Sequence, residues 1–219
     1  MWRAKVWLRW GAALLFGLSC VAVAAYAFTF FHYRDASMGN PFDAHFAVSG
    51  WDVPGHLFGA GLALLLAPLQ LLTGARRRWP RLHRLGGGLY AGGILIGGLS
   101  ALSLATHAQG GWASGSGFVL LALAWMGVTA HGIRYAVVGD YERHRRWMCR
   151  SVALTASAVT LRLMLGVGAA ALHWPFLTVY ITAAWACWTF NLAVCELWLR
   201  WPQIRARFAI KRQLAALPR

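Results

Sequence analysis

Six long apolar stretches, separated by short gaps that hold most of the charge, constrain the fold of this chain more than any other feature. A membrane-spanning helix needs about 20 mostly apolar residues, and each stretch is long enough. The predicted spans are 8–31, 54–73, 86–106, 114–137, 149–172 and 176–199. Apolar residues make up 59% of the 219 residues and charged residues only 12%. We therefore predict an all-α polytopic membrane protein with six transmembrane helices.

The net charge of +15 lies mainly at the ends of these stretches. Such a distribution orients helices and favours contact with anionic headgroups of the lipid bilayer, so we expect no nucleic acid partner. Lys and Arg crowd both ends of the chain and the second and fourth gaps, whereas the other three gaps together hold only Arg34. The positive-inside rule then predicts that both termini and both arginine-rich gaps are cytoplasmic, in a bacterial inner membrane.

Three regions follow from this pattern. Residues 1–53 are expected to form an N-terminal anchor helix and a periplasmic loop, 54–199 a five-helix membrane core, and 200–219 a basic cytoplasmic tail. The first helix is expected to be retained, because bulky residues rather than a small-residue cleavage site follow it. The tail alternates basic and apolar residues, which fits an amphipathic helix on anionic lipid and, nearly as well, a disordered tail.

A basic histidine motif stands at the start of the third and the fifth span, as Arg81-Leu82-His83-Arg84 and Arg143-His144-Arg145-Arg146. The two histidines are 144 − 83 = 61 residues apart, about two spans with their turns. We expect spans two and three and spans four and five to form a parallel pseudo-repeat, with the third and fifth helices diagonal in a four-helix arrangement. Facing imidazoles there could bind haem b or another metal. The alternative is two ordinary loops rich in His and Arg.

Arg162 falls near the middle of the fifth span, where an unpaired charge costs about 2.5–3.5 kcal/mol on insertion scales. It lies 18 residues, or five helical turns, after His144, so an ideal helix places both on one side with Ser151 and Thr155. Arg162 could contact a haem propionate, a quinone oxygen or an acidic substrate. The structural alternative is a lock formed with helix carbonyls, Gln70 or Asn191.

Three further features carry weaker signals. The third span has Gly88–Gly92 and Gly93–Gly97 spacings, which allow close helix packing and give no evidence for haem. His131 is expected near the inner face with the two motif histidines, and His56 is the strongest candidate among the histidines at outer helix ends. The four cysteines form no CxxC or haem-attachment motif, so we expect buried thiols.

Several of these segments together resemble a bacterial membrane family catalogued as domain of unknown function 2306. The resemblance rests on His56, Ala67-Pro68-Leu69-Gln70, Leu82-His83-Arg84, His144-Arg145-Arg146-Trp147-Met148 and Arg162. It implies a multi-span inner-membrane protein without an established activity, and it points to His56, Gln70, His83, His144 and Arg162 as site positions. The chain departs from the family at Ala67, where glycine is expected. At the level of the fold, the paired histidines also resemble cytochrome b561-type proteins.

Two classes of function fit these observations. In the first, a haem b protein moves electrons between a quinone and a partner, with His83 and His144 as axial ligands and Arg162 on a propionate or the quinone. In the second, a non-redox assembly, transport or scaffold protein uses its His and Arg residues to bind lipid, a metal ion or a partner membrane subunit. Walker, HExxH and GxSxG motifs do not occur, which argues against ATPase and hydrolase activities.

Overall fold

The computed structural model describes residues 2–30, 50–72 and 77–215, and within these ranges it contains helices and no strand. Most of the predicted periplasmic loop (31–49) and the end of the tail (216–219) lie outside the described residues. Six described segments are long and apolar enough to cross a membrane: Trp10–Thr29, Asp52–Leu71, Pro80–Ala105, Trp112–Val137, Tyr141–Ala171 and Phe176–Ala206. The prediction of an all-helical protein with six such helices is therefore confirmed.

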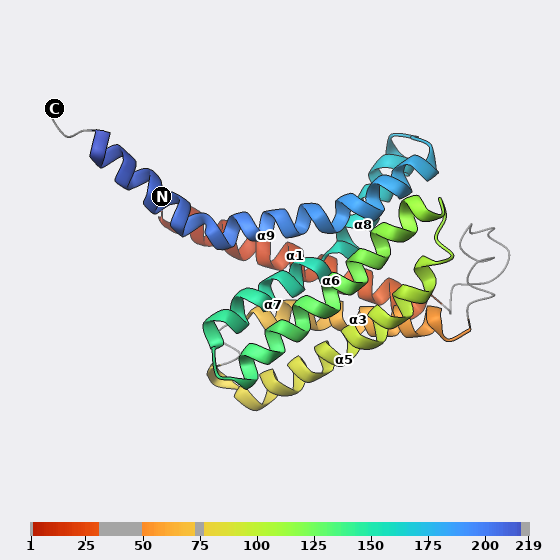
Figure 1. Ribbon diagram of the computed structural model, residues 1–219, viewed down its shortest axis with the longest axis horizontal. Helices are drawn as coiled ribbons and strands as arrows, with labels where there is room; N and C mark the ends of the chain where they lie inside the picture. The colour runs from red at the N-terminus through yellow and green to blue at the C-terminus, as the bar shows by residue number, and fades with distance from the viewer. Residues whose placement is uncertain (1, 31–49, 73–76, 216–219) are drawn as a thin grey trace.

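The helices follow one another along the chain as shown in Figure 1. They are α1 (Trp2–Thr29), α3 (Asp52–Leu71), α5 (Pro80–Ala105), α6 (Trp112–Val137), α7 (Tyr141–Thr155), α8 (Ser157–Leu165), the π-helix η2 (Gly166–Ala171) and α9 (Phe176–Ala215). The fifth predicted span is thus made of three consecutive pieces, α7, α8 and η2.

Four of these helices form a closed group around the core. α3 packs against α5, α5 against α6, α6 against α7, and α7 returns to α3. α5 and α7 therefore occupy opposite corners, which is the diagonal arrangement expected from the sequence. α1 packs outside this group against α3 and α8, and α9 runs along α6, α7 and α8 (Figure 1). That the two hairpins form a repeat stays a prediction.

Glycines bring α3 and α5 into backbone contact. A Cβ atom placed on Gly59 would lie 2.6 Å from the Gly97 nitrogen, and one on Gly93 would lie 2.7 Å from the Gly59 carbonyl oxygen. Such close approach is open only to residues without a side chain. The Gly93–Gly97 spacing packs as predicted, whereas Gly88 and Gly92 face open space with nothing within 4 Å of a Cβ atom.

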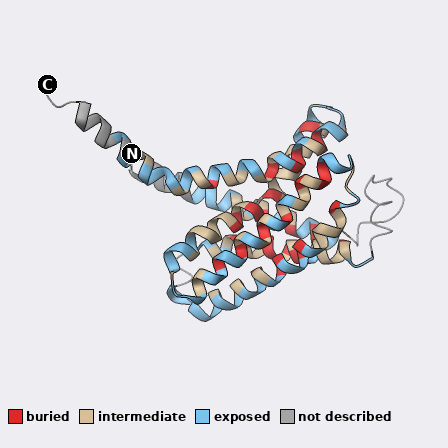
Figure 2. Ribbon diagram, viewed as in Figure 1, coloured by how far each residue is buried: buried red, intermediate tan, exposed pale blue. Residues whose placement is uncertain are grey.

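Buried residues gather where α3, α5, α6 and α7 face one another and on the sides of α1 and α9 that pack against this group, and the outward faces are exposed (Figure 2). Ile94, Trp125 and Leu154 lie in this core, whereas Leu95, Ile96 and Leu99 on the other side of α5 are more than half exposed. In water such a surface would be unstable, but a bilayer solvates it. The exposure pattern therefore agrees with a membrane-spanning bundle.

Helix boundaries differ from the prediction where capping residues override the apolar pattern. α5 begins at Pro80, six residues earlier than expected, because proline suits the first turn of a helix. α7 begins at Tyr141, eight residues earlier, because Asp140 caps it by accepting a hydrogen bond from the Arg143 N–H at 3.0 Å. α9 continues without interruption to Ala215, so the described part of the basic tail is helical.

Two irregularities divide the fifth span. α7 ends at Thr155, whose hydroxyl donates to the Ser151 carbonyl 2.9 Å away, a bond of the kind that bends helices. Further along, the Leu172 N–H donates to the Val167 carbonyl at 2.9 Å, the wider spacing of a π-helix. Between these points, α8 carries Arg162 in a segment separate from α7.

Candidate functional site

The two motif histidines lie at equivalent places in the first turns of α5 and α7, at the end of the bundle that we call the basic end. The His83 N–H donates to the Trp79 carbonyl at 3.0 Å, and the His144 N–H donates to the Asp140 carbonyl at 2.9 Å. Both rings are partly buried. The motifs therefore belong to the helices themselves rather than to the gaps before them.

The His144 ring is fixed on α6. Its Nδ1 lies 2.8 Å from the Gly132 carbonyl oxygen, and because a carbonyl only accepts, Nδ1 must carry the proton and donate. His131, also on α6, stacks on Trp147 of α7 with the ring centres 4.9 Å apart. His131 and His144 thus both lie in the contact between α6 and α7. His131 lies at the basic end, as predicted.

Gln70 belongs to the contact between α3 and α5. A Cβ atom placed on Gly86 would lie 2.7 Å from the Gln70 amide nitrogen, so Gln70 occupies the space that this glycine leaves free. Gln70 is therefore close to the α5 backbone one turn beyond His83. Arg162 bonds instead to the Ala158 carbonyl and stacks on Tyr26, so the pairing of Gln70 with Arg162 weighed from the sequence is not formed.

The diagonal between α5 and α7 is closed by a set of hydrogen-bonded side chains that we call the Tyr90 cluster. Its members come from α5, α6 and α7: Tyr90, Trp125, Thr129, Ser151 and Thr155. The Tyr90 hydroxyl lies 2.9 Å from Ser151 Oγ and 2.8 Å from Thr155 Oγ1. Tyr90 and Ser151 each follow their motif histidine by seven residues, or about 10 Å along a helix. Side chains therefore fill the space between α5 and α7 about two turns inside the histidines.

Every polar atom of the Tyr90 cluster has a partner. Trp125 Nε1 donates to Thr155 Oγ1 at 2.9 Å, and Thr129 Oγ1 lies 2.7 Å from both the Trp125 carbonyl and Ser151 Oγ. Tyr90 has no exposed surface, and the other four members are almost fully buried. A saturated and enclosed network of this kind specifies how helices pack and leaves no donor or acceptor for a ligand.

Arg162 has a different environment. Its Nη1 donates to the Ala158 carbonyl at 3.0 Å, and its guanidinium lies 5.5 Å from the centre of the Tyr26 ring on α1. Within the described residues no carboxylate pairs with it. Of the structural partners weighed from the sequence, a helix carbonyl is therefore confirmed. Asn191 is wrong, because it bonds instead to Thr160 and to the Ala153 carbonyl.

The polar stripe expected along one side of the fifth span is divided among three neighbours. His144 bonds to α6, Ser151 and Thr155 face Tyr90 on α5, and Arg162 stacks on α1. The break between α7 and α8 explains the contact of Arg162 with α1, because α8 does not continue the regular helix of α7. Arg162 thus leaves the four-helix core for the contact with α1.

The His56 ring on α3 is fixed against α5. His56 Nδ1 lies 2.9 Å from the Gly97 carbonyl oxygen, at the point where glycines join α3 and α5. Of the five positions indicated by the family resemblance, His56 and Arg162 lie away from the basic end, one against α5 and the other against α1.

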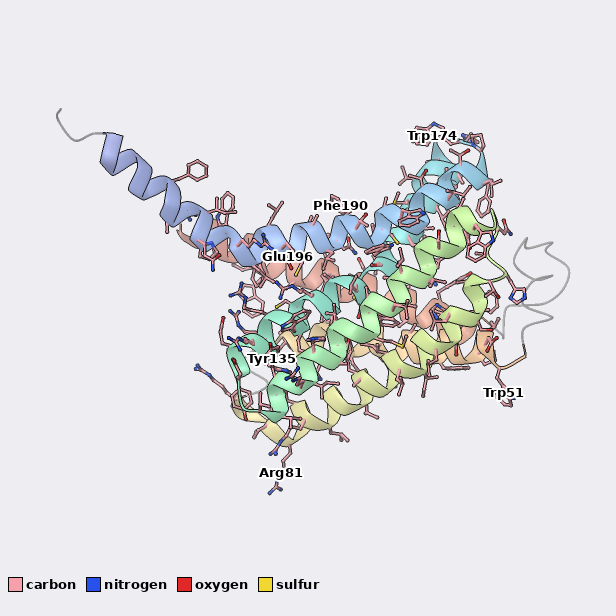
Figure 3. The ribbon with its side chains drawn as sticks, in the orientation of Figure 1. Trp51, Arg81, Tyr135, Trp174, Phe190 and Glu196 are labelled. Atoms are coloured by element: carbon pink, nitrogen blue, oxygen red, sulfur yellow. The ribbon has the colours of Figure 1, made fainter. Side chains whose placement is uncertain are left out.

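An ion pair that the sequence analysis missed joins α7 to α9. Arg150 Nε donates to Oε1 of Glu196, and Arg150 Nη2 donates to Oε2 of the same carboxylate at 3.2 Å. Arg200 reaches the same carboxylate at 3.2 Å. Figure 3 shows Glu196 on the side of α9 that faces α7, opposite Phe190. An acidic residue inside an apolar span was the available signal, since such residues pair within the bundle.

The described residues offer limited support for a metal centre. They contain no group of three or more His, Cys, Asp or Glu side chains placed to hold a metal ion. A haem needs only two histidines, but the Tyr90 cluster fills the deeper part of the diagonal between α5 and α7. The fold and these side chains define a multi-span helical membrane protein with polar groups inside the membrane region.

Comparison with known proteins narrows this class to one family. Residues 53–199 match the family described as "Predicted membrane protein (DUF2306)", so the chain belongs to that family. No curated protein and no solved structure matches the chain. The family resemblance drawn from the sequence is therefore confirmed, and the likeness to cytochrome b561-type proteins gains no support.

Proposed function

We propose that the protein binds a quinone from the surrounding bilayer, through the guanidinium of Arg162. The proposal rests on one observation: inside a membrane-spanning segment, Arg162 donates a single hydrogen bond and faces no carboxylate within the described residues. A guanidinium has five N–H donors, so four are left for a ligand. Charges inside the membrane are costly and in most cases serve a function.

The surroundings of Arg162 favour a ligand that arrives from the lipid. Arg162 is only partly buried, and Tyr26, on which it stacks, is 52% exposed on a helix at the edge of the bundle. A quinone is lipid-soluble, and its carbonyl oxygens accept hydrogen bonds without carrying a charge. Its ring also matches the aromatic ring of Tyr26 at the edge of the bundle.

The proposed setting is a bacterial inner membrane with the basic end in the cytoplasm. Exposed arginines gather at this end, at the start of α5 and at the turn between α6 and α7. Figure 3 shows one of them, Arg81, extending away from the bundle. Positive charge on one side favours that orientation. Contact with a partner membrane subunit is part of the same proposal, since an electron donor or acceptor would need access to the quinone.

Ligand titration tests the quinone site. The purified protein in nanodiscs of neutral lipid would be titrated with a short-chain quinone while the intrinsic tryptophan fluorescence is followed. Loss of a hydrogen bond from a charged group costs about 1.5–3 kcal/mol, so Arg162→Gln should weaken binding about tenfold or more. Arg145→Gln is the matched control, because Arg145 is exposed and pairs with Glu142. Equal quinone binding by the wild type and Arg162→Gln would reject the proposal.

Haem b on His83 and His144 is a second candidate function, favoured by the orientation of one ring. The Gly132 carbonyl holds Nδ1 of His144 and leaves Nε2 as the free ligand atom of the neutral ring, an arrangement common in metal-binding histidines. Reduced protein should then show Soret and α bands that His83→Ala and His144→Ala abolish, whereas His131→Ala keeps them. A purified sample without these bands would exclude haem.

A further inference from the structure

An open hollow with a volume of about 450 Å³ lies at the start of α5. It is lined by Arg78, Trp79, Pro80, Arg81 and Leu82, all of them exposed. Figure 3 shows Arg81 extending away from the bundle, and the Arg78 guanidinium lies 5.6 Å from the centre of the Trp79 ring. The volume is in the range of small-ligand sites. The hollow thus combines two cationic groups with apolar surface.

The charge of this hollow is not balanced by the chain. Within the part that the structure describes, no carboxylate pairs with Arg78 or Arg81. The sequence has no acidic residue between Asp52 and Asp140. Asp52 accepts a hydrogen bond from Ser103, at the far end of α5. We therefore expect the balancing negative charge to come from outside the chain.

The start of α7, at the same end of the bundle, shows the opposite arrangement. Arg143 pairs with Asp140, and Arg145 pairs with Glu142, each at 3.4 Å. Arg143 also lies over an aromatic ring, that of Tyr135, as Arg78 lies over Trp79. The two helix starts therefore carry similar arginines, and the difference between them is the presence of carboxylates at α7.

An exposed apolar stripe continues from the hollow along α5. Its side chains recur at spacings of three, four and seven residues and are about half exposed or more: Leu82, Leu85, Leu89, Ile96 and Leu99. Gly88 and Gly92 lie on the same side, and a Cβ atom on either would have nothing within 4 Å. From Leu82 to Gly92 the helix rises about 15 Å, half the thickness of a bilayer's hydrocarbon core. The stripe next to the hollow thus matches the depth of one leaflet.

We infer that the start of α5 binds one anionic phospholipid, with its phosphate in the hollow and an acyl chain along the stripe. Phosphate oxygens accept hydrogen bonds from guanidinium groups, and a net negative headgroup balances Arg78 and Arg81. A zwitterionic headgroup carries its own cation and balances them less. Free phosphate would occupy the hollow and leave the stripe unused. This site is independent of the proposed quinone site.

Two double substitutions separate this site from the general positive charge of the basic end. Arg78→Gln/Arg81→Gln removes the charge of the hollow, whereas Arg143→Gln/Arg145→Gln removes the same charge from α7 and is the matched control. An arginine near the membrane surface contributes about fivefold to the affinity for an anionic lipid, so losing both should weaken binding about 25-fold. Arg78→Lys/Arg81→Lys keeps the charge and should recover most of this affinity.

The experiment measures lipid binding to the purified protein in a neutral detergent by native mass spectrometry. Short-chain phosphatidylglycerol is compared with phosphatidylcholine of the same chains, and competition by inorganic phosphate is followed by fluorescence of a labelled phosphatidylglycerol at 0.15 M salt, where distant charges are screened. The wild type should bind one phosphatidylglycerol about fivefold or more tightly than phosphatidylcholine. Arg78→Gln/Arg81→Gln should lose this preference, and Arg143→Gln/Arg145→Gln should keep it.

Four results would overturn the inference. The first is equal binding of the two lipids by the wild type. The second is an equal loss of affinity in the two glutamine double variants, which would indicate diffuse charge attraction. The third is a loss in Arg78→Lys/Arg81→Lys as large as that in Arg78→Gln/Arg81→Gln. The fourth is displacement of the lipid by an equal concentration of inorganic phosphate, which would assign the hollow to free phosphate.

Discussion

The Tyr90 cluster and the surroundings of Arg162 are both polar regions within the membrane-spanning helices, yet they are built in opposite ways. Tyr90 has no exposed surface, and each polar atom around it has a partner. Arg162 is partly exposed, donates one hydrogen bond and stacks on a ring that is itself half exposed. The first region is closed and internally satisfied, whereas the second is open and retains unused donors.

This difference separates structural polarity from binding capacity. In a membrane, polar side chains stabilise helix contacts when they satisfy one another, and the modest strength of such bonds suits a packing role. A charged group with unused donors gives no comparable benefit to the fold, so its presence needs another explanation. Substitutions in the two regions should therefore change different properties: stability in the core, and binding with little loss of stability at Arg162.

The largest effect is expected at the contact between α3 and α5 that supports the Tyr90 cluster. In Gly59→Val the new side chain would begin 2.6 Å from the Gly97 nitrogen and force the helices apart. We expect a loss of about 3 kcal/mol or more in the free energy of unfolding, since overpacking a tight contact is costly. Gly92→Val, where nothing lies within 4 Å of the Cβ position, is the matched control. Unfolding in detergent would measure both, and equal stabilities would contradict the observed packing.

Tyr90→Phe tests the core without changing its shape. The substitution removes the hydroxyl that bonds Ser151 and Thr155, at about 1 kcal/mol for each bond, so the protein should lose about 2 kcal/mol of stability. Quinone binding by the folded protein should not change. Tyr135→Phe is the comparison, because Tyr135 has a cation–π contact with Arg143 and no hydroxyl hydrogen bond within the described residues. A Tyr90→Phe protein as stable as Tyr135→Phe would show that the cluster contributes little.

Arg162→Leu should raise the free energy of unfolding, whereas the two preceding substitutions lower it. Removing the charge avoids an insertion cost of about 2.5–3.5 kcal/mol, while the lost cation–π contact is worth about 0.5–2 kcal/mol. The free energy of unfolding of the ligand-free protein should therefore rise by about 1 kcal/mol, even though quinone binding is lost. Chemical unfolding with and without quinone would separate the two effects. A clear loss of stability in the ligand-free variant would make Arg162 a structural lock instead.

Ser157→Ala should have the smallest effect. Ser157 Oγ is buried without a hydrogen-bond partner in the described part of the chain. Deleting an unsatisfied hydroxyl removes a desolvation penalty, so we expect the free energy of unfolding, measured in detergent, to rise by up to about 1 kcal/mol. Thr155→Val nearby should instead destabilise the protein, because Thr155 belongs to the Tyr90 cluster. Destabilisation by Ser157→Ala would point to a partner for this hydroxyl.

The sequence predicted the spans better than it predicted side-chain partners. Apolar length alone identified all six helices, and the 61-residue spacing led to the diagonal placement of α5 and α7. α5 and α7 begin earlier than predicted because of Pro80 and Asp140, and the apolar pattern contains no information about such residues at helix starts. The pairing of Glu196 with Arg150 does not follow from the sequence, because Arg150 also fits the group of arginines that orient the fifth span.

Membership of the membrane class, the six spans and the uneven distribution of arginine are properties of the chain itself, because hydrophobic length and charge act segment by segment. Which polar groups meet is a different kind of property. Only the packing of helices could place Tyr90 against Ser151 across the core and bring Arg162 to Tyr26 of α1. The break at Ala156 and the glycine contact between α3 and α5 decide these neighbours, since both act through the relative rotation and approach of whole helices.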